Sequence, residues 1–284
     1  MIFLMDDWHF IELSGPDAPD FLHRMTSIDI KKGKYGDGFL LEATGKIILY
    51  FKMAYSNGSF ILASPHPADR TVAAFEKSHF SEKLKIAPLK GWRYFKFIDC
   101  EESAAVQEKL HLSYDHRILV LPEDLGESFN ETGDVSLFVP PDAELPDLLK
   151  SMRLGSKEER EILRISRGDP RSPIELSGGW NPLELGLTGA VHEDKGCYPG
   201  QEVIEKIRST GRTPRSLVKI KGQGQCPATP LALDEGGTIT SAIGTDQETH
   251  QETHQGTQWI GLAITRKSQG LNLNLQGQKL EVRP

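Results

Sequence analysis

One eight-residue run limits the backbone of this chain more tightly than any other: Lys195–Glu202, with the sequence KGCYPGQE. Its two glycines reach conformations closed to other residues and Pro199 fixes a turn, so we expect Cys197 on a tight bend with its sulfur exposed. Lys195, or a helix beginning beyond the turn, would favour the thiolate, the nucleophilic and metal-binding form of cysteine. The alternative is a small buried side chain in a structural turn. The polar Gln201 and Glu202 favour a functional site.

The length of the chain sets the scale of the fold. A chain of 284 residues exceeds the usual single domain, so we expect two or three cores, and a hydrophobic content of 38% suffices to build them. No apolar run is long enough to span a membrane. The opening Met1–Met5 meets Asp6 and Asp7 at once, which resembles neither a secretory leader nor a transit peptide. The sequence therefore predicts a cytoplasmic protein.

The cysteine content excludes several classes of site. Only Cys100, Cys197 and Cys226 occur, and none of them forms a C-x-x-C pair. This spacing indicates neither a disulfide scaffold nor a self-contained zinc or iron–sulfur site. We therefore expect no metal site within the chain, and a cluster could at most be shared with a partner.

The charge of the chain is negative overall but locally positive. A net charge of −7 argues against direct nucleic-acid binding, which needs an excess of cations to neutralise phosphates. Between residues 206 and 221, however, there are six cations and no carboxylate. A ligand with a carboxylate or phosphate tail would suit this strip, and a solvated hairpin face is the alternative. The six residues are Lys206, Arg208, Arg212, Arg215, Lys219 and Lys221.

The pattern of strands and helices in the first half predicts an α+β protein. Asn57-Gly58 is a favoured tight-turn pair, and with Thr44-Gly45 it separates three apolar runs that we expect to form antiparallel hairpins. The expected strands are 9–13, 38–43, 46–55, 59–63, 92–98, 117–121 and 135–139, and the expected helices are 17–25, 67–80 and 103–110.

The second half is expected to change from helices to strands. Two helices are expected within 143–166, the second over Lys157–Ile165 and ended by Gly168-Asp169-Pro170. Residues 171–187 are rich in proline and glycine and should cross over irregularly. Short strands at 216–221, 237–241, 259–264 and 279–282 predict a small β-barrel. Between them the repeat Gln247–His254 is expected to be a surface loop, the alternative being a metal site built on His250 and His254.

The run KGCYPGQE also matches the signature of the YgfZ family of folate-binding proteins, relatives of the glycine-cleavage aminomethyltransferase. Regions that agree in order are Leu13–Leu22, Thr26–Asp29, Arg164–Pro170, Gly237–Ser241 and Ile260–Ala263. This resemblance implies an α+β fold with a three-part, ring-like architecture and a small C-terminal β-barrel. It implies a two-lobed folate-binding region over residues 1–210, with a middle lobe at roughly 45–140, and the barrel over 211–284.

The resemblance further implies a function. It points to support of iron–sulfur cluster assembly or repair in client enzymes, including tRNA-modifying ones, with tetrahydrofolate or a derivative as cofactor and any cluster held only transiently or through a partner. Cys197 would be the reactive residue, Lys195 would activate it, and Glu202 would orient the loop or handle a proton. Folate contact is expected at Trp8, Tyr198 and Gln201, and the glutamate tail at Lys206, Arg208 and Arg212.

One departure from the aminomethyltransferases bears on the reaction. Those enzymes carry two adjacent aspartates in the first hairpin, whereas the matching stretch here, Thr44–Tyr50, holds no carboxylate. Leu49 cannot relay a proton or stabilise a cation, so the sequence argues against ordinary aminomethyl transfer. Two alternatives stay open: a tetrahydrofolate-dependent transferase acting on a small amine, with Cys197 merely structural, and a non-catalytic scaffold for iron–sulfur assembly partners.

Overall fold

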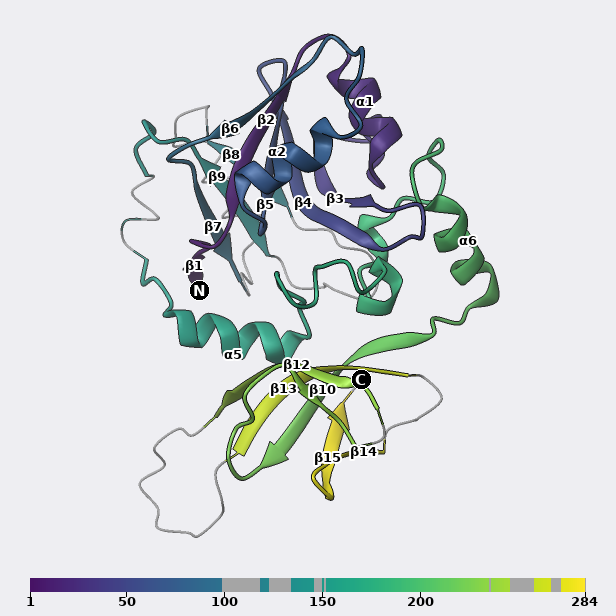
Figure 1. Cartoon of the computed structure of the whole chain (residues 1–284). Coiled ribbons are helices and arrows are strands. Elements are labelled where there is room, and N and C mark those ends of the chain that lie inside the picture. Colours follow the sequence, from purple (N-terminus) through teal and green to yellow (C-terminus); the bar gives the residue numbers. More distant parts are fainter. Residues whose placement is uncertain are drawn as a thin grey trace. The chain divides into compact units, whose positions relative to one another are not determined.

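The computed structural model describes residues 1–98, 118–122, 134–145, 150, 152–234, 236–245, 258–266 and 272–283. Its contacts divide the chain into two compact units (Figure 1). The first comprises Met1–Gly155, Leu176–Pro182 and Leu187–Glu205. The second comprises Ser156–Glu175, Leu183–Gly186 and Lys206–Pro284. Among the described residues, no helix is long and apolar enough to cross a membrane.

The first unit contains a five-stranded antiparallel sheet with one face covered by helices. Its strand order is β3 (Tyr35–Leu41), β4 (Ile47–Ser56), β5 (Ser59–Ser64), β2 (His9–Ser14) and β6 (Lys85–Leu89). The expected hairpin is confirmed, because Asn57 and Gly58 both adopt positive φ, 51° and 82°. Helices α1 (Ala18–Met25) and α2 (Ala68–Glu76) pack on the face formed by alternate residues such as Leu49, Phe51 and Met53.

A second, four-stranded sheet faces the first one within the same unit. Its order is β1 (Ile2–Leu4), β7 (Arg93–Phe97), β9 (Val135–Val139) and β8 (Leu119–Pro122). Aromatic rings fill the layer between the sheets: Phe10 meets Phe138 edge to face at 5.1 Å, and Tyr94 meets Phe138 at 5.4 Å. The helix expected at 103–110 and the repeat at 247–254 lie outside the described residues, as does most of the first helix expected within 143–166.

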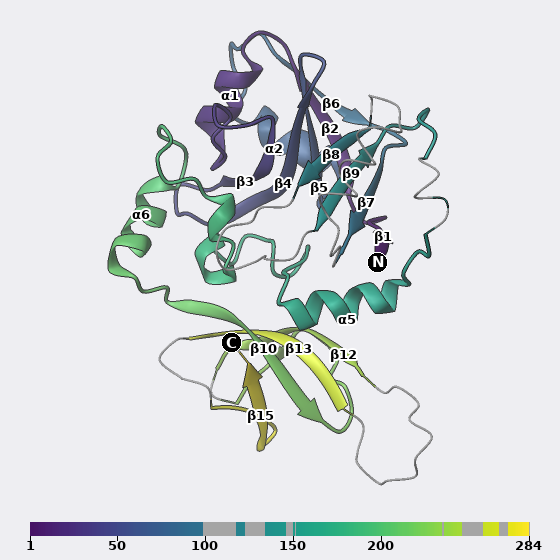
Figure 2. The ribbon, with the colours of Figure 1, turned by 180° about the vertical axis from the view of Figure 1, so that it is seen from behind.

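The second unit is a curled antiparallel sheet with one helix against it (Figure 2). The strand order is β11 (Leu231–Ala232), β12 (Thr238–Gly244), β13 (Gln258–Arg266), β10 (Arg215–Gln223), β15 (Gln278–Arg283) and β14 (Leu273–Leu275). Trp259 is its largest buried side chain and lies over Gly222 of the neighbouring strand, where any larger residue would clash with the indole. Helix α5 (Lys157–Arg167) packs on β12 and β13, so it belongs to this unit although it precedes residue 211.

Helix α5 begins and ends where the sequence predicts. Ser156 and Glu159 form a reciprocal capping box at its start. Gly168 follows its last residue in the left-handed conformation, with φ of 87°. By contrast, the helix expected over 67–80 ends at Glu76. Beyond it the His79 ring bonds the Glu76 carboxylate and the Glu82 carbonyl, and the N–H groups of Phe80 and Ser81 donate to the Glu82 carboxylate instead of continuing the helix.

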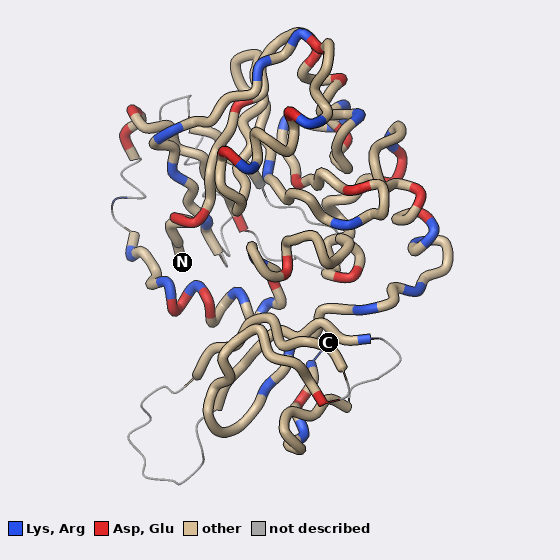
Figure 3. The backbone as a smooth tube through the Cα atoms, viewed as in Figure 1, with Lys and Arg blue, Asp and Glu red and all other residues tan. Residues whose placement is uncertain are grey.

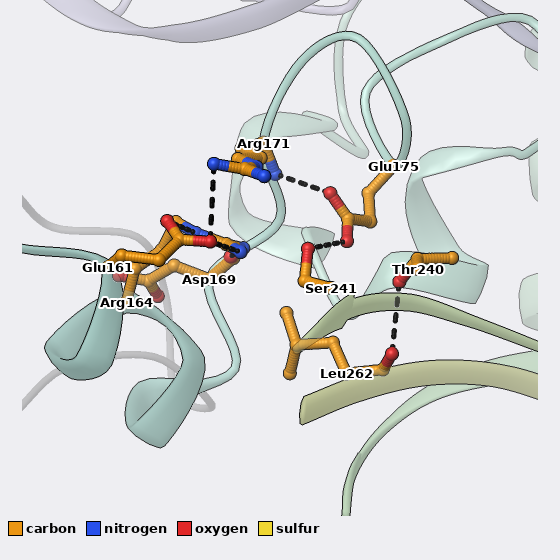
Figure 4. Close-up of polar contacts among 8 residues, drawn as sticks. All are labelled: Glu161, Arg164, Asp169, Arg171, Glu175, Thr240, Ser241 and Leu262. Carbon is orange, nitrogen blue, oxygen red and sulfur yellow. Dashed lines mark hydrogen bonds and ion pairs between the residues drawn. The ribbon is translucent and has the colours of Figure 1, made fainter. Parts of the chain in front are cut away.

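An ion cluster closes the C-terminal end of α5 (Figure 4). The Arg164 guanidinium binds both carboxylate oxygens of Glu161, at 2.7 and 2.8 Å, and donates to the carbonyl oxygen of Asp169. Arg171 approaches the same carboxylate at 3.2 Å. Burial opposes ionisation of Glu161, but the hydrogen bonds and charges of these two arginines outweigh it and lower its pKa.

A second polar contact ties the following loop to the sheet (Figure 4). Glu175 is fully buried, and one of its oxygens accepts a hydrogen bond from the Ser241 hydroxyl of β12 at 2.7 Å. The other oxygen accepts from the Arg171 backbone N–H at 3.1 Å. The carboxylate thus fixes residues 171–175 against β12, which satisfies a buried polar group that would otherwise destabilise the fold.

Candidate functional site

Lys195 anchors the KGCYPGQE run on the connection between α1 and β3. Its side-chain nitrogen donates to the backbone carbonyls of His23, at 2.5 Å, Thr26, and Ile28, at 3.0 Å. The last carbonyls of a helix lack partners within it, and α1 ends at these residues, so the ammonium satisfies them and complements the helix dipole. Burial lowers the pKa of Lys195 to about 8, against the opposing charge of Asp29.

This contact gives Lys195 a role different from the expected one. All three protons of its ammonium group are donated to backbone carbonyls that precede Cys197 by about 170 residues. None remains to bond the thiol. The lysine therefore holds the loop in place, and its activation of Cys197 stays a prediction.

Two further contacts fix the start of the same segment. The Ser27 hydroxyl donates to the carbonyl of Ala190 at 2.6 Å, and the His192 N–H donates to the carbonyl of Ser27 at 3.1 Å. Ser27 is fully buried, so these bonds are shielded from water. The segment before Lys195 is thus joined to the α1–β3 connection at several points.

The far end of the run is fixed by close backbone packing. Gly200 has a φ of 82°, and a Cβ atom there would lie 2.5 Å from the carbonyl oxygen of Glu42 and 3.0 Å from the Cα of Gly45. No side-chained residue fits this position, which agrees with the sequence interpretation of Gly200. Between the two anchors, the Tyr198 ring lies with its centroid 5.0 Å from the Lys195 nitrogen, and the tyrosine is buried.

Cys197 is exposed at the tip of this doubly anchored loop. Its neighbour Gly196 is also exposed, whereas Lys195 and Tyr198 on either side are buried. The exposure excludes the alternative of a small buried side chain. An accessible thiol on a fixed loop can react with a molecule that comes to it from solution.

The remaining expected residues of the run begin helix α6 (Gln201–Thr210). Gln201 is half-buried, and its backbone N–H donates to the carbonyl of Tyr198. Glu202 is exposed in the first turn, where a carboxylate is favoured by the helix dipole. Both residues therefore lie on the same short segment as Cys197.

Trp8 lies in the layer between the two sheets of the first unit. It is half-buried and meets the rings of Tyr50 and Tyr94 edge to face, at 5.9 and 5.0 Å. These two rings belong to β4 and β7 and not to the run 195–202. Trp8 and Cys197 both belong to the first unit.

A buried polar cluster beside Trp8 was missed by sequence reasoning. The Tyr50 hydroxyl lies 2.5 Å from one oxygen of Asp37, and the Lys52 ammonium lies 2.9 and 3.1 Å from the two oxygens of the same carboxylate. Tyr50 and Lys52 alternate with residues of the helix-covered face, so they point into the layer between the sheets. Leu49 is fully buried on the opposite face, and it cannot reach this layer.

The six residues of the cationic strip differ in their exposure and in their partners. Lys206 and Arg212 are exposed and Arg208 is half-buried, and all three belong to the second unit, whereas Trp8 and Cys197 belong to the first. Figure 3 shows basic residues following the chain from α6 into β10. Arg215 within the strip lies 3.0 Å from the buried carboxylate of Glu184, so it has a structural partner. Within the described part of the chain, no group of three His, Cys, Asp or Glu side chains could hold a metal.

Comparison with known proteins gives several relatives, among them a chloroplastic putative transferase of Arabidopsis thaliana that is 25% identical over 229 residues, which cover 72% of this chain and 53% of that protein. The mitochondrial iron–sulfur cluster assembly factor IBA57 homologue of Cryptococcus neoformans is 26% identical over 250 residues, which cover 74% of this chain and 63% of that protein. The tRNA-modifying protein YgfZ of Serratia proteamaculans is 23% identical over 282 residues, covering 92% and 83%. The chain thus spans less than two thirds of the fungal relative. No family model matches.

The fold has a counterpart among solved structures. The glycine cleavage system aminomethyltransferase T of Bartonella henselae superposes with a TM-score of 0.73 at 15% identity, over 99% of this chain and 83% of that chain. This likeness confirms the expected α+β, aminomethyltransferase-type fold. The IBA57 and YgfZ relatives align along most of the chain, as the signature run predicts. These comparisons support the resemblance to the YgfZ family that the signature run indicates.

Proposed function

We propose that this protein binds a folate and supports the assembly or repair of iron–sulfur clusters in client enzymes through Cys197. The exposure of this thiol on a loop anchored at both ends carries the proposal. A cluster-assembly role needs a cysteine that a second protein can reach, and a fixed loop lowers the entropy lost when that protein binds. The names of the relatives, iron–sulfur cluster assembly factor and tRNA-modifying protein, agree with this role.

Folate binding is proposed for the layer that contains Trp8. A half-buried indole offers an apolar surface for stacking a planar heterocycle, and the Asp37 carboxylate with Tyr50 supplies polar groups nearby. The residues present therefore fit a pterin. The glutamate tail is proposed to meet Lys206, Arg208 and Arg212, with Tyr198 and Gln201 lining the folate site.

Other parts of the loop would act on the thiol. Cys197 stands shortly before helix α6, and Glu202 in the first turn of that helix is proposed to orient the loop or to exchange a proton. Lys195 is proposed to position the loop. The compartment stays a prediction: the cytoplasm is expected from sequence, whereas the name of the fungal relative assigns that protein to mitochondria.

The test is whether this protein, expressed in bacterial cells that lack their own YgfZ, restores the activity of an iron–sulfur enzyme. We expect Cys197→Ala to abolish restoration while the protein accumulates normally and unfolds at the wild-type temperature. Cys226→Ala, at a half-buried cysteine in the other unit, is the matched control and should restore fully. Full restoration by Cys197→Ala would contradict the proposal and favour the scaffold alternative.

An assay for the transferase alternative completes the test. Purified protein is incubated with tetrahydrofolate and an aminomethyl donor, and methylene-tetrahydrofolate is measured. We expect no product, because Leu49 supplies no proton-transfer group and is buried away from the layer that holds Trp8. Product formed equally by wild type and Cys197→Ala would instead support the transferase.

A further inference from the structure

The loop between α2 and β6 presents one aromatic side chain to solvent. Phe80 is 86% exposed, and the next most exposed large apolar residue among those described is Leu154, at 51%. An isolated exposed apolar residue is common on protein surfaces. What distinguishes Phe80 is the rigidity of the loop that carries it.

The carboxylate of Glu82 organises this loop from within. One oxygen accepts hydrogen bonds from the backbone N–H of Phe80 and of Ser81, at 3.0 and 3.1 Å. The other oxygen accepts from the Arg24 guanidinium of α1 at 2.8 Å. These donors, the Phe80 N–H foremost, lower the pKa of Glu82 to about 2, so the carboxylate is ionised at neutral pH.

Contacts on both sides of Phe80 complete the anchoring. The His79 ring bonds the Glu76 carboxylate at 2.9 Å and the Glu82 carbonyl at 3.0 Å. Beyond the tip, the Lys83 N–H donates to the Asp17 carboxylate at 2.5 Å, just before α1. The backbone that carries Phe80 is therefore held in place before any partner arrives, which reduces the entropy lost on binding.

The surface around Phe80 is cationic. Lys77, Lys83 and Lys85 are all exposed, and none of them forms an ion pair within the described structure. The carboxylates of the same loop are engaged, Glu82 by three donors and Glu76 by His79. An exposed aromatic side chain on a fixed backbone, with unpaired lysines before and after it in the chain, complements an acidic protein surface with an apolar pocket.

Helix α1 connects this loop to the thiol loop. Arg24 binds Glu82 of the Phe80 loop, while the carbonyl of the preceding residue, His23, accepts from Lys195 of the Cys197 loop. Both loops are thus attached to consecutive residues in the last turn of α1, within one unit. One turn of α1 therefore supports both the Phe80 loop and the Cys197 loop.

We propose that Phe80 and the surrounding lysines form the docking surface for the acidic protein that works with Cys197 in iron–sulfur assembly. This inference rests on the proposed function. Phe80 inserts into an apolar pocket of the partner, Lys77, Lys83 and Lys85 meet its carboxylates, and the docked partner faces the thiol. Folate binding does not depend on this surface.

The experiment measures how far the Phe80→Ser variant restores the activity of the iron–sulfur enzyme in the same cells. Tyr35→Ser, at an exposed aromatic residue of β3, is the matched control. We expect Phe80→Ser to lower restoration roughly tenfold at limiting expression, the loss typical of an interface anchor, while unfolding temperature and tetrahydrofolate binding stay unchanged. Tyr35→Ser should restore normally. The charge-reversed double variant Lys83→Glu, Lys85→Glu should fail, and Lys83→Arg, Lys85→Arg should succeed.

Other outcomes would overturn the inference. If Phe80→Ser restores fully while Cys197→Ala fails, the docking surface is wrong and the proposed function stands; if Cys197→Ala restores as well, the proposed function itself fails. Wild-type sedimentation with vesicles of 30% phosphatidylserine, lost in Phe80→Ser, would assign the surface to a membrane. A wild-type dimer in light scattering that becomes monomeric in Phe80→Ser would assign it to a second copy of the chain.

Discussion

The ammonium of Lys195 lies 3.0 Å from the carbonyl oxygen of Ile28, a residue 167 positions earlier in the chain. Through this bond and its two companions, a lysine from the signature run completes the end of a helix in the N-terminal part of the same unit. The position of Cys197 therefore depends on contacts that the cysteine itself does not make.

Replacing this lysine should destabilise the protein without touching the thiol. Lys195→Met removes three donors and leaves buried carbonyls without partners, so we expect the free energy of unfolding to fall by about 2–3 kcal/mol. Urea denaturation measures the loss. Lys32→Met is the control, because its ammonium is exposed and lies 3.9 Å from Asp29. Equal stability of the two variants would show that Lys195 does not anchor the loop.

Gly200 offers a test of the other anchor with a close internal control. Gly200 and Gly58 share a φ of 82°, but a Cβ at Gly58 would meet nothing within 4 Å. Gly58→Ala therefore reports the backbone strain alone, about 1 kcal/mol, whereas Gly200→Ala adds the clash with Glu42 and should cost about 1–3 kcal/mol more. We expect only Gly200→Ala to change the rate at which iodoacetamide alkylates Cys197. Indistinguishable behaviour of the two alanine variants would argue against close packing at Gly200.

His66 should make the fold sensitive to acid. It is fully buried, and burial, aided by the charge of Arg70, lowers its pKa from 6.5 to about 4. The unfolded chain therefore binds a proton between these values that the folded chain does not, so stability falls as the pH drops from 6.5 towards 4, by at most about 3 kcal/mol. Urea denaturation at pH 7 and 4.5 should show a smaller drop in His66→Gln than in wild type. His9→Gln, at an exposed histidine, should keep the wild-type drop.

Two neighbouring hydroxyls of β12 should differ in their effect on the second unit. Ser241→Ala leaves an oxygen of the buried Glu175 without its donor, so we expect a loss of about 1–3 kcal/mol. Thr240→Val removes only a bond to the Leu262 carbonyl and keeps the side-chain shape, so the loss should be smaller. Thermal unfolding compares them, and a larger effect of Thr240→Val would contradict the role given to Glu175.

Much of the fold could be predicted because local signals determine it. Asn57-Gly58 demands positive φ at both residues, and Ser156, Glu159 and Gly168 mark both ends of α5. The exposed Cys197 also followed from local sequence. Helix α2, in contrast, was expected to extend to Phe80, because the apolar spacing of Val72 and Phe75 does not reveal the hydrogen bonds that end it.

The role of Lys195 could not be predicted for a different reason. Its partners are backbone carbonyls of residues 23–28, and a carbonyl carries no sequence signal. The cluster of Asp37, Tyr50 and Lys52 was missed because its members come from two strands and meet only through the β3–β4 register, in which Asp37 lies opposite Lys52. Both features depend on tertiary contacts that link distant or separately placed residues.

Tetrahydrofolate binding measured by calorimetry tests the central claim most directly, in wild type, Trp8→Ala and Cys197→Ala. The two rings that Trp8 meets belong to β4 and β7 and not to the thiol loop, so we expect micromolar binding by wild type, at least tenfold weaker binding by Trp8→Ala, and unchanged binding by Cys197→Ala. That result would establish a folate platform distinct from a reactive thiol. Absence of binding by wild type would contradict the claim and leave the chain as a scaffold that kept only the shape of a folate enzyme.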